Sequence, residues 1–337
     1  MFLAVLGGTL LQPPAANAHP GGHGPYDWTG VDCLQLPDHL IRFCQDAQAG
    51  SHDGGDDWDQ DWDQEGSEDE VTEPVEPEPV TTSSIKGNSR TFTIASVNIN
   101  RYMRASNIIR DRSAIMRRSQ IDIIGWQEAD RNRDWFNGVD GWRTVKQAGS
   151  AGVPISFRQS TFELVGSRVE RLNSARAGHR KGYHWTARAA HVVQLRHRAT
   201  GKLVTVINAH IVPGIEDHAR PGTPANNANA KVARRAIRKV AKLYRTAEGT
   251  AVGTGDFNWN YAADVRVQHP KYVQRIGQYA TSSYEALGLG SVAPTHGNRY
   301  IDYVWLGRQS AAAFVKHKSL GGYRSDHRPL LAAIELR

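Results

Sequence analysis

Residues 251–258 read AVGTGDFN. The first five residues of this stretch are small, apolar or β-branched, which predicts a short β-strand over 251–255. Asp256 follows the predicted strand directly, and Asn258 comes two residues later. One polar residue at the end of a strand is commonly a turn former or a cap, but functional side chains also gather where loops leave a rigid sheet. Several other predicted strands of this chain end in polar residues in the same way.

Short segments rich in valine, isoleucine and threonine predict eight strands. They cover residues 91–97, 121–127, 153–157, 190–195, 203–209, 251–255, 301–306 and 330–335. Apolar residues at helical spacing predict two helices, over 106–118 and 228–244. Because strands and helices interleave without a strict strand–helix–strand rhythm, we expect an α/β layered fold rather than a doubly wound sheet. The chain has neither a dinucleotide-binding glycine fingerprint nor a P-loop.

Eight side chains of the types that bind Mg²⁺ and phosphate lie at or beside the ends of these strands. They are Asn98, Glu128, His210, Asp256, Asn258, Asp302, Asp326 and His327. Carboxylate and amide oxygens are ligands that Mg²⁺ prefers, and histidine changes its charge near neutral pH. Eight such residues at one kind of position favour a shared site for a metal ion and a phosphate.

Six motifs follow one another along the chain. They are SVNIN at 96–100, GWQE at 125–128, NAH at 208–210, GDFN at 255–258, YIDY at 300–303 and SDHRP at 325–329. Their order resembles that of the endonuclease/exonuclease/phosphatase superfamily, which includes deoxyribonuclease I, exonuclease III, neutral sphingomyelinases and inositol polyphosphate 5-phosphatases. His210 is similar to the histidine of the deoxyribonuclease-I-like and phosphatase-like branches.

The resemblance implies a catalytic domain over residues 89–337. Its fold would be a four-layer α/β sandwich of two packed mixed β-sheets flanked by helices, with the site at the rim. The resemblance implies that Glu128 ligates Mg²⁺ with Asn98 beside it, and that Asp326 ligates a second metal. Mn²⁺, or Mg²⁺ together with a structural Ca²⁺, stays open.

The resemblance also implies catalytic roles. His327 would accept a proton from the attacking water, oriented by Asp302, and an imidazole near its ordinary pKa suits that task. Asp256 and Asn258 would hold the nucleophile and the scissile phosphate.

His210 would donate a proton to the leaving oxygen or bind phosphate. In deoxyribonuclease I a glutamate supports this histidine, but the corresponding segment here, residues 149–158, contains no carboxylate. The two roles of His210, and a purely structural one as a capping residue, therefore stay open.

Charge divides the chain into two parts. Residues 1–85 contain one basic and 17 acidic residues, whereas residues 86–337 contain 40 basic and 17 acidic residues, a net charge of +23. A field of this sign favours a polyanion such as nucleic acid, an anionic membrane surface or a cell-wall polymer. Solubility is the alternative explanation.

The N-terminal region predicts export. Residues 1–18 are typical of a signal peptide, with an apolar run and a small-x-small cleavage pattern, so we expect a secreted, extracellular protein. Within the short segment 19–50, Cys33 and Cys44 are expected to form a disulfide, because an exported chain meets an oxidising compartment.

Residues 51–88 are predicted to be an acidic disordered linker. Residues 51–80 contain 13 acidic residues and no lysine or arginine, so the segment cannot bury enough apolar surface to fold. The alternative to a plain linker is that 51–80 contacts the basic domain.

Basic and aromatic residues alternate over 168–188, which suits a loop that tracks a phosphate backbone and stacks on bases. Arg176, Arg180, Lys181 and Tyr183 are the expected substrate contacts, and an ordinary basic loop is the alternative. The basic face of the helix over 228–244 has the same two interpretations, with a solvated outer helix favoured.

These features together predict a secreted, Mg²⁺-dependent endonuclease that acts as a monomer. It would hydrolyse phosphodiester bonds of DNA, with RNA open, and show little sequence specificity. The alternative is a secreted phosphodiesterase or phosphatase acting on a phospholipid, as sphingomyelinases do, or on an inositol phosphate. A lipid substrate calls for an exposed apolar loop, and no cluster of Phe, Leu or Trp within residues 86–337 provides one. No run of 18 apolar residues occurs, so we expect no membrane insertion.

Overall fold

A computed structural model describes most of the C-terminal part of the chain. The described residues are 90–129, 136, 138–150, 152–175, 187–217, 219–220, 222–266 and 273–337. The predicted signal peptide, the Cys33–Cys44 pair and the acidic segment lie outside these residues. Within them, no helix is both long enough and apolar enough to cross a membrane.

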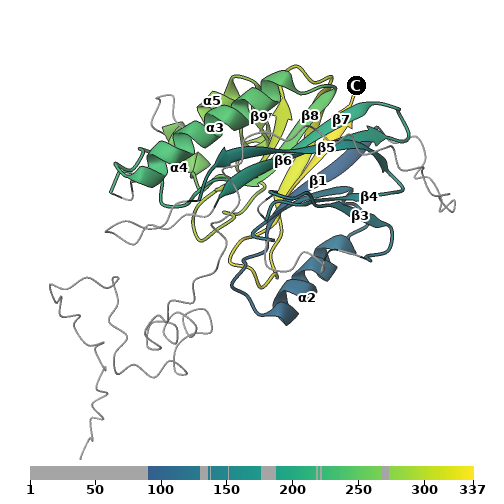
Figure 1. The fold of residues 1–337 in the computed structure, drawn as a ribbon, viewed down its shortest axis with the longest axis horizontal. Coiled ribbons are helices and arrows are strands. Elements are labelled where there is room, and N and C mark those ends of the chain that lie inside the picture. The colour runs from purple at the N-terminus through teal and green to yellow at the C-terminus, as the bar shows by residue number, and fades with distance from the viewer. Residues whose placement is uncertain are drawn as a thin grey trace, which may run out of the picture. The chain divides into compact units, whose positions relative to one another are not determined.

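Within the described residues, twelve strands form two six-stranded sheets. In spatial order, sheet A consists of β11 (Ala312–Ser319), β12 (Leu330–Leu336), β1 (Thr91–Asn98), β2 (Ile123–Gln127), β4 (Ile155–Arg158) and β3 (Trp142–Val145). Sheet B consists of β5 (Phe162–Asn173), β6 (Arg188–His197), β7 (Leu203–His210), β8 (Thr250–Asp256), β10 (Asp302–Gly307) and β9 (Ala280–Ser282). The two sheets pack face to face (Figure 1).

Each sheet contains one parallel pair joined by a helix. Helix α2 (Ala105–Met116) connects β1 to β2, and helix α3 (Ala228–Thr246) connects β7 to β8. The other neighbouring strands are antiparallel. Three shorter helices, α4 (Tyr261–Arg266), α5 (Gln274–Gly277) and α6 (Ser283–Leu287), follow β8.

The helices cover the outer faces of the two sheets (Figure 1). One hydrophobic core runs from sheet A through sheet B to α3, and it includes Ile94, Val206 and Ile237. A second core, which includes Ile115 and Trp126, lies between sheet A and α2. Helices thus flank two packed mixed sheets, which confirms the predicted four-layer α/β sandwich.

The eight predicted strands correspond to the eight interior strands of the two sheets. The structure adds β3, β5, β9 and β11, which are the edge strands. Strand β5 also corrects the expected loop over 168–188, because residues 168–173 belong to this strand.

A buried polar cluster joins the two sheets next to the ends of their parallel strands. Asn208 on β7 accepts hydrogen bonds at Oδ1 from Gln127 Nε2 of β2 at 2.7 Å and from Thr254 Oγ1 of β8 at 3.0 Å. Its Nδ2 donates to the carbonyl of Trp126 at 2.7 Å. Because buried polar groups are costly when unpaired, these bonds fix the position of one sheet on the other.

Gly125 is the position on β2 that permits this close approach. A Cβ added there would lie 1.8 Å from Thr254 Oγ1 and 2.9 Å from Asn208 Oδ1. We therefore expect Gly125→Ala to lower the free energy of unfolding by roughly 1–3 kcal/mol, the usual cost of overpacking. Urea unfolding checks this, with Gly290→Ala as the control because a Cβ there meets no atom within 4 Å. Equal midpoints for the two variants would contradict the packing argument.

Candidate active site

The topology brings the ends of the two parallel pairs together. Asn98 ends β1 in register with Gln127 of β2, and His210 ends β7 in register with Asp256 of β8. Asn98 Nδ2 donates to Asp256 Oδ2 at 3.1 Å and so links the two pairs. Strand β10, antiparallel to β8, begins at this edge with Asp302 opposite Asp256. Strand β12, antiparallel to β1, begins there as well, so the preceding loop with Asp326 and His327 reaches the same place.

His327 and Asp302 form a buried hydrogen-bonded pair. His327 Nδ1 lies 2.8 Å from Asp302 Oδ2. The loop that carries His327 is held by Asp111 of α2, whose Oδ2 accepts hydrogen bonds from the backbone N–H groups of Arg324 and Ser325. Because a carboxylate at Nδ1 fixes the tautomer of an imidazole, the other ring nitrogen, Nε2, is the one free to exchange a proton.

Carboxylates around His327 control its charge. Burial alone lowers the pKa of His327, but Asp302, Asp256 and Asp326 outweigh burial and raise this pKa to about 10. The sequence led us to expect an imidazole near its ordinary pKa. The difference arises because three carboxylates from separate loops and strands converge on one ring, which no single motif reveals.

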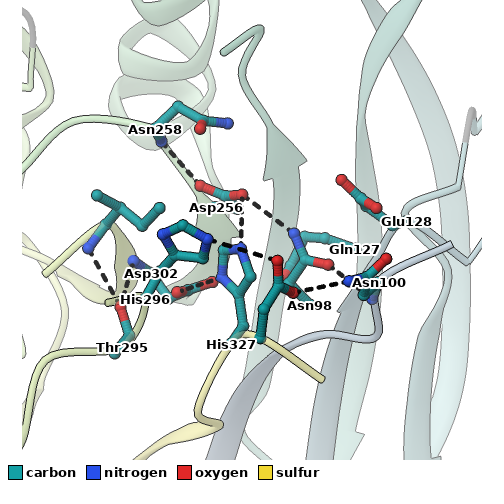
Figure 2. Close-up of polar contacts among 12 residues, drawn as sticks. Asn98, Asn100, Gln127, Glu128, Asp256, Asn258, Thr295, His296, Asp302 and His327 are labelled. Carbon is teal, nitrogen blue, oxygen red and sulfur yellow. Dashed lines mark hydrogen bonds and ion pairs between the residues drawn. The ribbon is translucent and has the colours of Figure 1, made fainter. Parts of the chain in front are cut away.

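Asp256 lies at the centre of the site, between His327 and Asn98 (Figure 2). Its Oδ1 accepts the backbone N–H of Asn258 at 2.8 Å, and its Oδ2 lies 3.4 Å from His210 Nε2 and 3.9 Å from His327 Nε2. Burial raises the pKa of Asp256 to about 7, and repulsion from Asp302 acts in the same direction.

An arginine, rather than a supporting carboxylate, lies beside His210. Its Nδ1 lies 3.3 Å from Arg188 Nη1, and both side chains are buried. A guanidinium has no acceptor and keeps its protons, so Nδ1 must be the unprotonated nitrogen and Nε2 carries the proton. Burial, followed by the positive charges of Arg188, Arg101 and His327, lowers the pKa of His210 well below its ordinary value. His210 is therefore a neutral donor directed at Asp256.

This tautomer leads to a spectroscopic prediction. In the wild type, ¹⁵N NMR of the imidazole nitrogens should show His210 with its proton on Nε2. Arg188→Met should raise the pKa of His210, because it removes the positive charge beside Nδ1. Arg196→Met, an exposed change on the same strand, should leave the His210 signals unchanged. A proton on Nδ1 in the wild type would contradict the assignment.

Three backbone positions beside these side chains are strained. Asn100, Glu128 and Asn258 have φ values of 48°, 57° and 51°, and they are the only non-glycine residues of the described chain with positive φ. Strain of this kind persists where surrounding structure enforces it and is frequent at functional sites. Here it sets the direction of Glu128 directly after β2 and of Asn258 two residues after β8.

A divalent cation fits the oxygen atoms of this site. Glu128 Oε2 accepts the backbone N–H of Arg101 at 3.0 Å and lies 3.6 Å from Arg101 Nε. Asp302 Oδ1 is buried and accepts no hydrogen bond from the described chain. Asp256, Asp302 and His327 are close enough together to share an ion, and Glu128 is near enough to add to the rise in the pKa of Asp256. Carboxylates with the amide oxygen of Asn98 make the all-oxygen donor set that Mg²⁺ prefers.

A second polar cluster lies beside the first, around Asp326. Asn100 Nδ2 donates to Asp326 Oδ1 at 3.0 Å, and His296 Nε2 lies 3.5 Å from Asp326 Oδ2. The His296 ring also packs on His327, with 4.6 Å between ring centroids. His296, Asp326 and His327 are close enough together to share a metal ion.

The structure thus brings the eight residues predicted at strand ends to one edge of the sandwich. Arg176, Arg180, Lys181 and Tyr183 lie outside the described residues. Arg101 and His296 carry no signal in the sequence that marks them as site residues. Arg188 stands out only as part of a basic segment, and its place at the start of the apolar strand β6 was the available signal.

Comparisons with known proteins agree with this architecture. No family model matches the sequence, and no curated protein matches it. The structure is similar to an endonuclease/exonuclease/phosphatase from Bacteroides vulgatus, at 18% identity and a TM-score of 0.54, over 73% of this chain and 99% of that chain. It is similar to D. rerio TDP2 complexed with a single-strand DNA product, at 12% identity and a TM-score of 0.53, over 73% and 99%.

A third similar structure is the mannosyl-6-phosphatase of Bacteroides thetaiotaomicron, at 16% identity and a TM-score of 0.51, over 72% of this chain and 99% of that chain. Identities this low establish a common fold and no more. Residues 90–337 therefore have the fold of the endonuclease/exonuclease/phosphatase proteins.

Proposed function

We propose that this protein is an exported, metal-dependent phosphodiesterase that cleaves nucleic acid, with DNA as the favoured substrate. The observation that carries the proposal is the meeting of the His327–Asp302 pair with Asp256, Glu128 and Asn98 at one edge of the sandwich. A histidine with an orienting carboxylate supplies proton transfer. Carboxylate and amide oxygens supply a place for a hard cation beside it.

Glu128 and Asn98 would hold Mg²⁺, and Asp326 would serve a second ion, with Mn²⁺ as the alternative metal. When bound, the cation neutralises charge on the phosphoryl oxygens and offsets the carboxylates that raise the pKa of His327. The geometry of the chain's own groups supports the remaining roles.

His327 takes the proton of the attacking water at Nε2, since Asp302 occupies Nδ1. Asp256 and Asn258 position the water and the phosphate. When a substrate is bound, His210 would turn its Nε2–H from Asp256 to a phosphate oxygen. It does not serve as a general acid, because losing the single proton of a neutral imidazole is unfavourable at neutral pH.

Two observations support nucleic acid over lipid. Residues 86–337 carry a net charge of +23, and each phosphate neutralised by lysine or arginine contributes affinity through counterion release. The exposed large apolar residues of the described chain are Tyr102, Ile109, Val165 and Val315. They belong to different elements and build no apolar loop that could enter a bilayer interface.

A substrate panel tests this proposal. The full-length protein with Mg²⁺ is incubated with supercoiled plasmid, single-stranded RNA, sphingomyelin vesicles and an inositol polyphosphate. Nicking of the plasmid, abolished by EDTA, is the expected result. If the plasmid stays intact while sphingomyelin or the inositol phosphate is hydrolysed, the substrate is a phospholipid or an inositol phosphate instead of nucleic acid. N-terminal sequencing of protein collected outside the cell, expected to begin at residue 19, tests export.

A further inference from the structure

The exposed face of α3 carries a dense row of positive charge. Seven lysine and arginine side chains of this helix are exposed, and residues 228–246 contain no aspartate or glutamate. The seven are Lys231, Arg234, Arg235, Arg238, Lys239, Lys242 and Arg245. The opposite face, with Val232, Ile237 and Val240, is buried against sheet B. We call the seven exposed residues the α3 basic row.

The arrangement of these charges does not serve the helix itself. Lys231, Arg235, Arg238 and Lys242 form no ion pair with a carboxylate of the described chain. Like charges spaced three and four residues apart repel one another on a helix surface. The first turn has no acidic residue, and only Arg245 lies in the last turn, where a cation is favourable for the helix dipole. A solvated helix would gain stability from mixed charges, so helix stability does not account for the row.

The α3 basic row begins next to the active-site edge. Helix α3 follows the loop that leaves His210, and Asn229 Nδ2 donates to the carbonyl of Pro213 at 2.7 Å. Asn227 Nδ2 donates to the carbonyl of Gly214 at 2.8 Å. From Lys231 to Arg245 the row then extends along the outer face of sheet B for about 21 Å, at 1.5 Å per residue. Figure 1 shows α3 lying along this outer face.

We propose that the α3 basic row binds the phosphate backbone of a nucleic acid that extends beyond the active site. The inference rests on the proposed function, because the bound strand is taken to be the substrate. Charge complementarity identifies the partner, because Lys231, Arg235, Arg238 and Lys242 recur about once per helical turn of 5.4 Å without an ion pair in the described chain. Four of the seven residues in the row are arginines, which bind phosphate through a planar fork. Contacts of this kind give affinity without sequence preference.

Binding measurements in EDTA test the row without cleavage. The full-length protein is titrated with a labelled 30-base-pair DNA duplex over a series of salt concentrations. Arg235→Gln/Arg238→Gln/Lys242→Gln is compared with a control of equal charge loss, Arg196→Gln/Lys316→Gln/Lys318→Gln, whose three residues are exposed on β6 and β11. The α3 variant should bind about tenfold more weakly at 50 mM salt. The slope of log K against log salt should fall by about two to three, close to 0.9 for each phosphate that the variant no longer neutralises.

Hydrolysis of bis(p-nitrophenyl) phosphate is measured in parallel, because so small a diester does not reach along α3. Both variants should retain the wild-type rate. If the wild type hydrolyses no diester, the proposed function fails, while the comparison of duplex affinities still decides the role of the row.

Equal affinity and equal salt slope for the α3 variant and the wild type would overturn the proposal. That result is expected if the chain's own acidic residues 51–80, with their 13 carboxylates, occupy the row instead. Equal losses in the α3 variant and the control would also overturn it, because net charge rather than this face would then govern binding.

Discussion

His327→Ala should reduce phosphodiester hydrolysis by about 10²- to 10⁴-fold, the usual contribution of general acid–base catalysis. Alanine removes the only imidazole that is both hydrogen-bonded to Asp302 and within 4 Å of Asp256 in the described site. Affinity for nucleic acid should be largely retained, because binding depends on many phosphate contacts. Initial rates of plasmid nicking, together with duplex affinity in EDTA, measure the two effects separately.

Two further variants test whether the loss of activity in His327→Ala comes from misfolding instead of from the lost imidazole. Asp302→Asn should lose activity to a similar extent, because an amide no longer stabilises the imidazolium that forms during proton transfer. His317→Asn, on β11 and outside the site, should keep the wild-type rate. A His327→Ala protein with full activity would show that His327 has no catalytic role.

Glu128→Gln should lower activity at least about 100-fold and raise the Mg²⁺ concentration needed for half-maximal rate. Even residues that only support metal ligands cost 10- to 100-fold when changed, and Glu128 is the expected ligand itself. Glutamine keeps the acceptor for the Arg101 backbone N–H, so the loop after β2 should stay in place. A Mg²⁺ titration of the hydrolysis rate measures the shift.

Glu163→Gln is the matched control for Glu128→Gln. Glu163 is an exposed carboxylate on β5 that lies 3.9 Å from Arg198, and its loss should not affect the Mg²⁺ dependence. An unchanged activation curve for Glu128→Gln would place the metal elsewhere. The cluster of His296, Asp326 and His327 would then be the next candidate.

The interior of the fold could be predicted from the sequence, and its edges could not. Interior strands such as β1 and β8 are buried along most of their length. They therefore consist mainly of apolar and small residues, and such segments are recognisable as strands in the sequence. On the edge strand β5, only Phe162 and Leu172 are buried. Strands β3 and β9 have four and three residues, too few for a period to be visible.

The positions of most site residues could be predicted from the sequence because of the strand topology. Each of the eight residues predicted at strand ends lies at or beside the end or start of an interior strand, and the two parallel pairs bring those ends together. Arg188 and His296 were missed as site residues because their significance depends on pairing with His210 and Asp326, which are distant in sequence. The raised pKa of His327 has the same origin, since its carboxylate neighbours come from separate parts of the chain.

The central claim is that a metal ion and the His327–Asp302 pair hydrolyse a phosphodiester bond at this edge of the sandwich. Its most direct test is the rate of plasmid nicking by wild type and His327→Ala, each measured with Mg²⁺ and with EDTA. We predict nicking only by the wild type and only with Mg²⁺. Equal nicking by the two proteins, or nicking by the wild type that persists in EDTA, would contradict the claim.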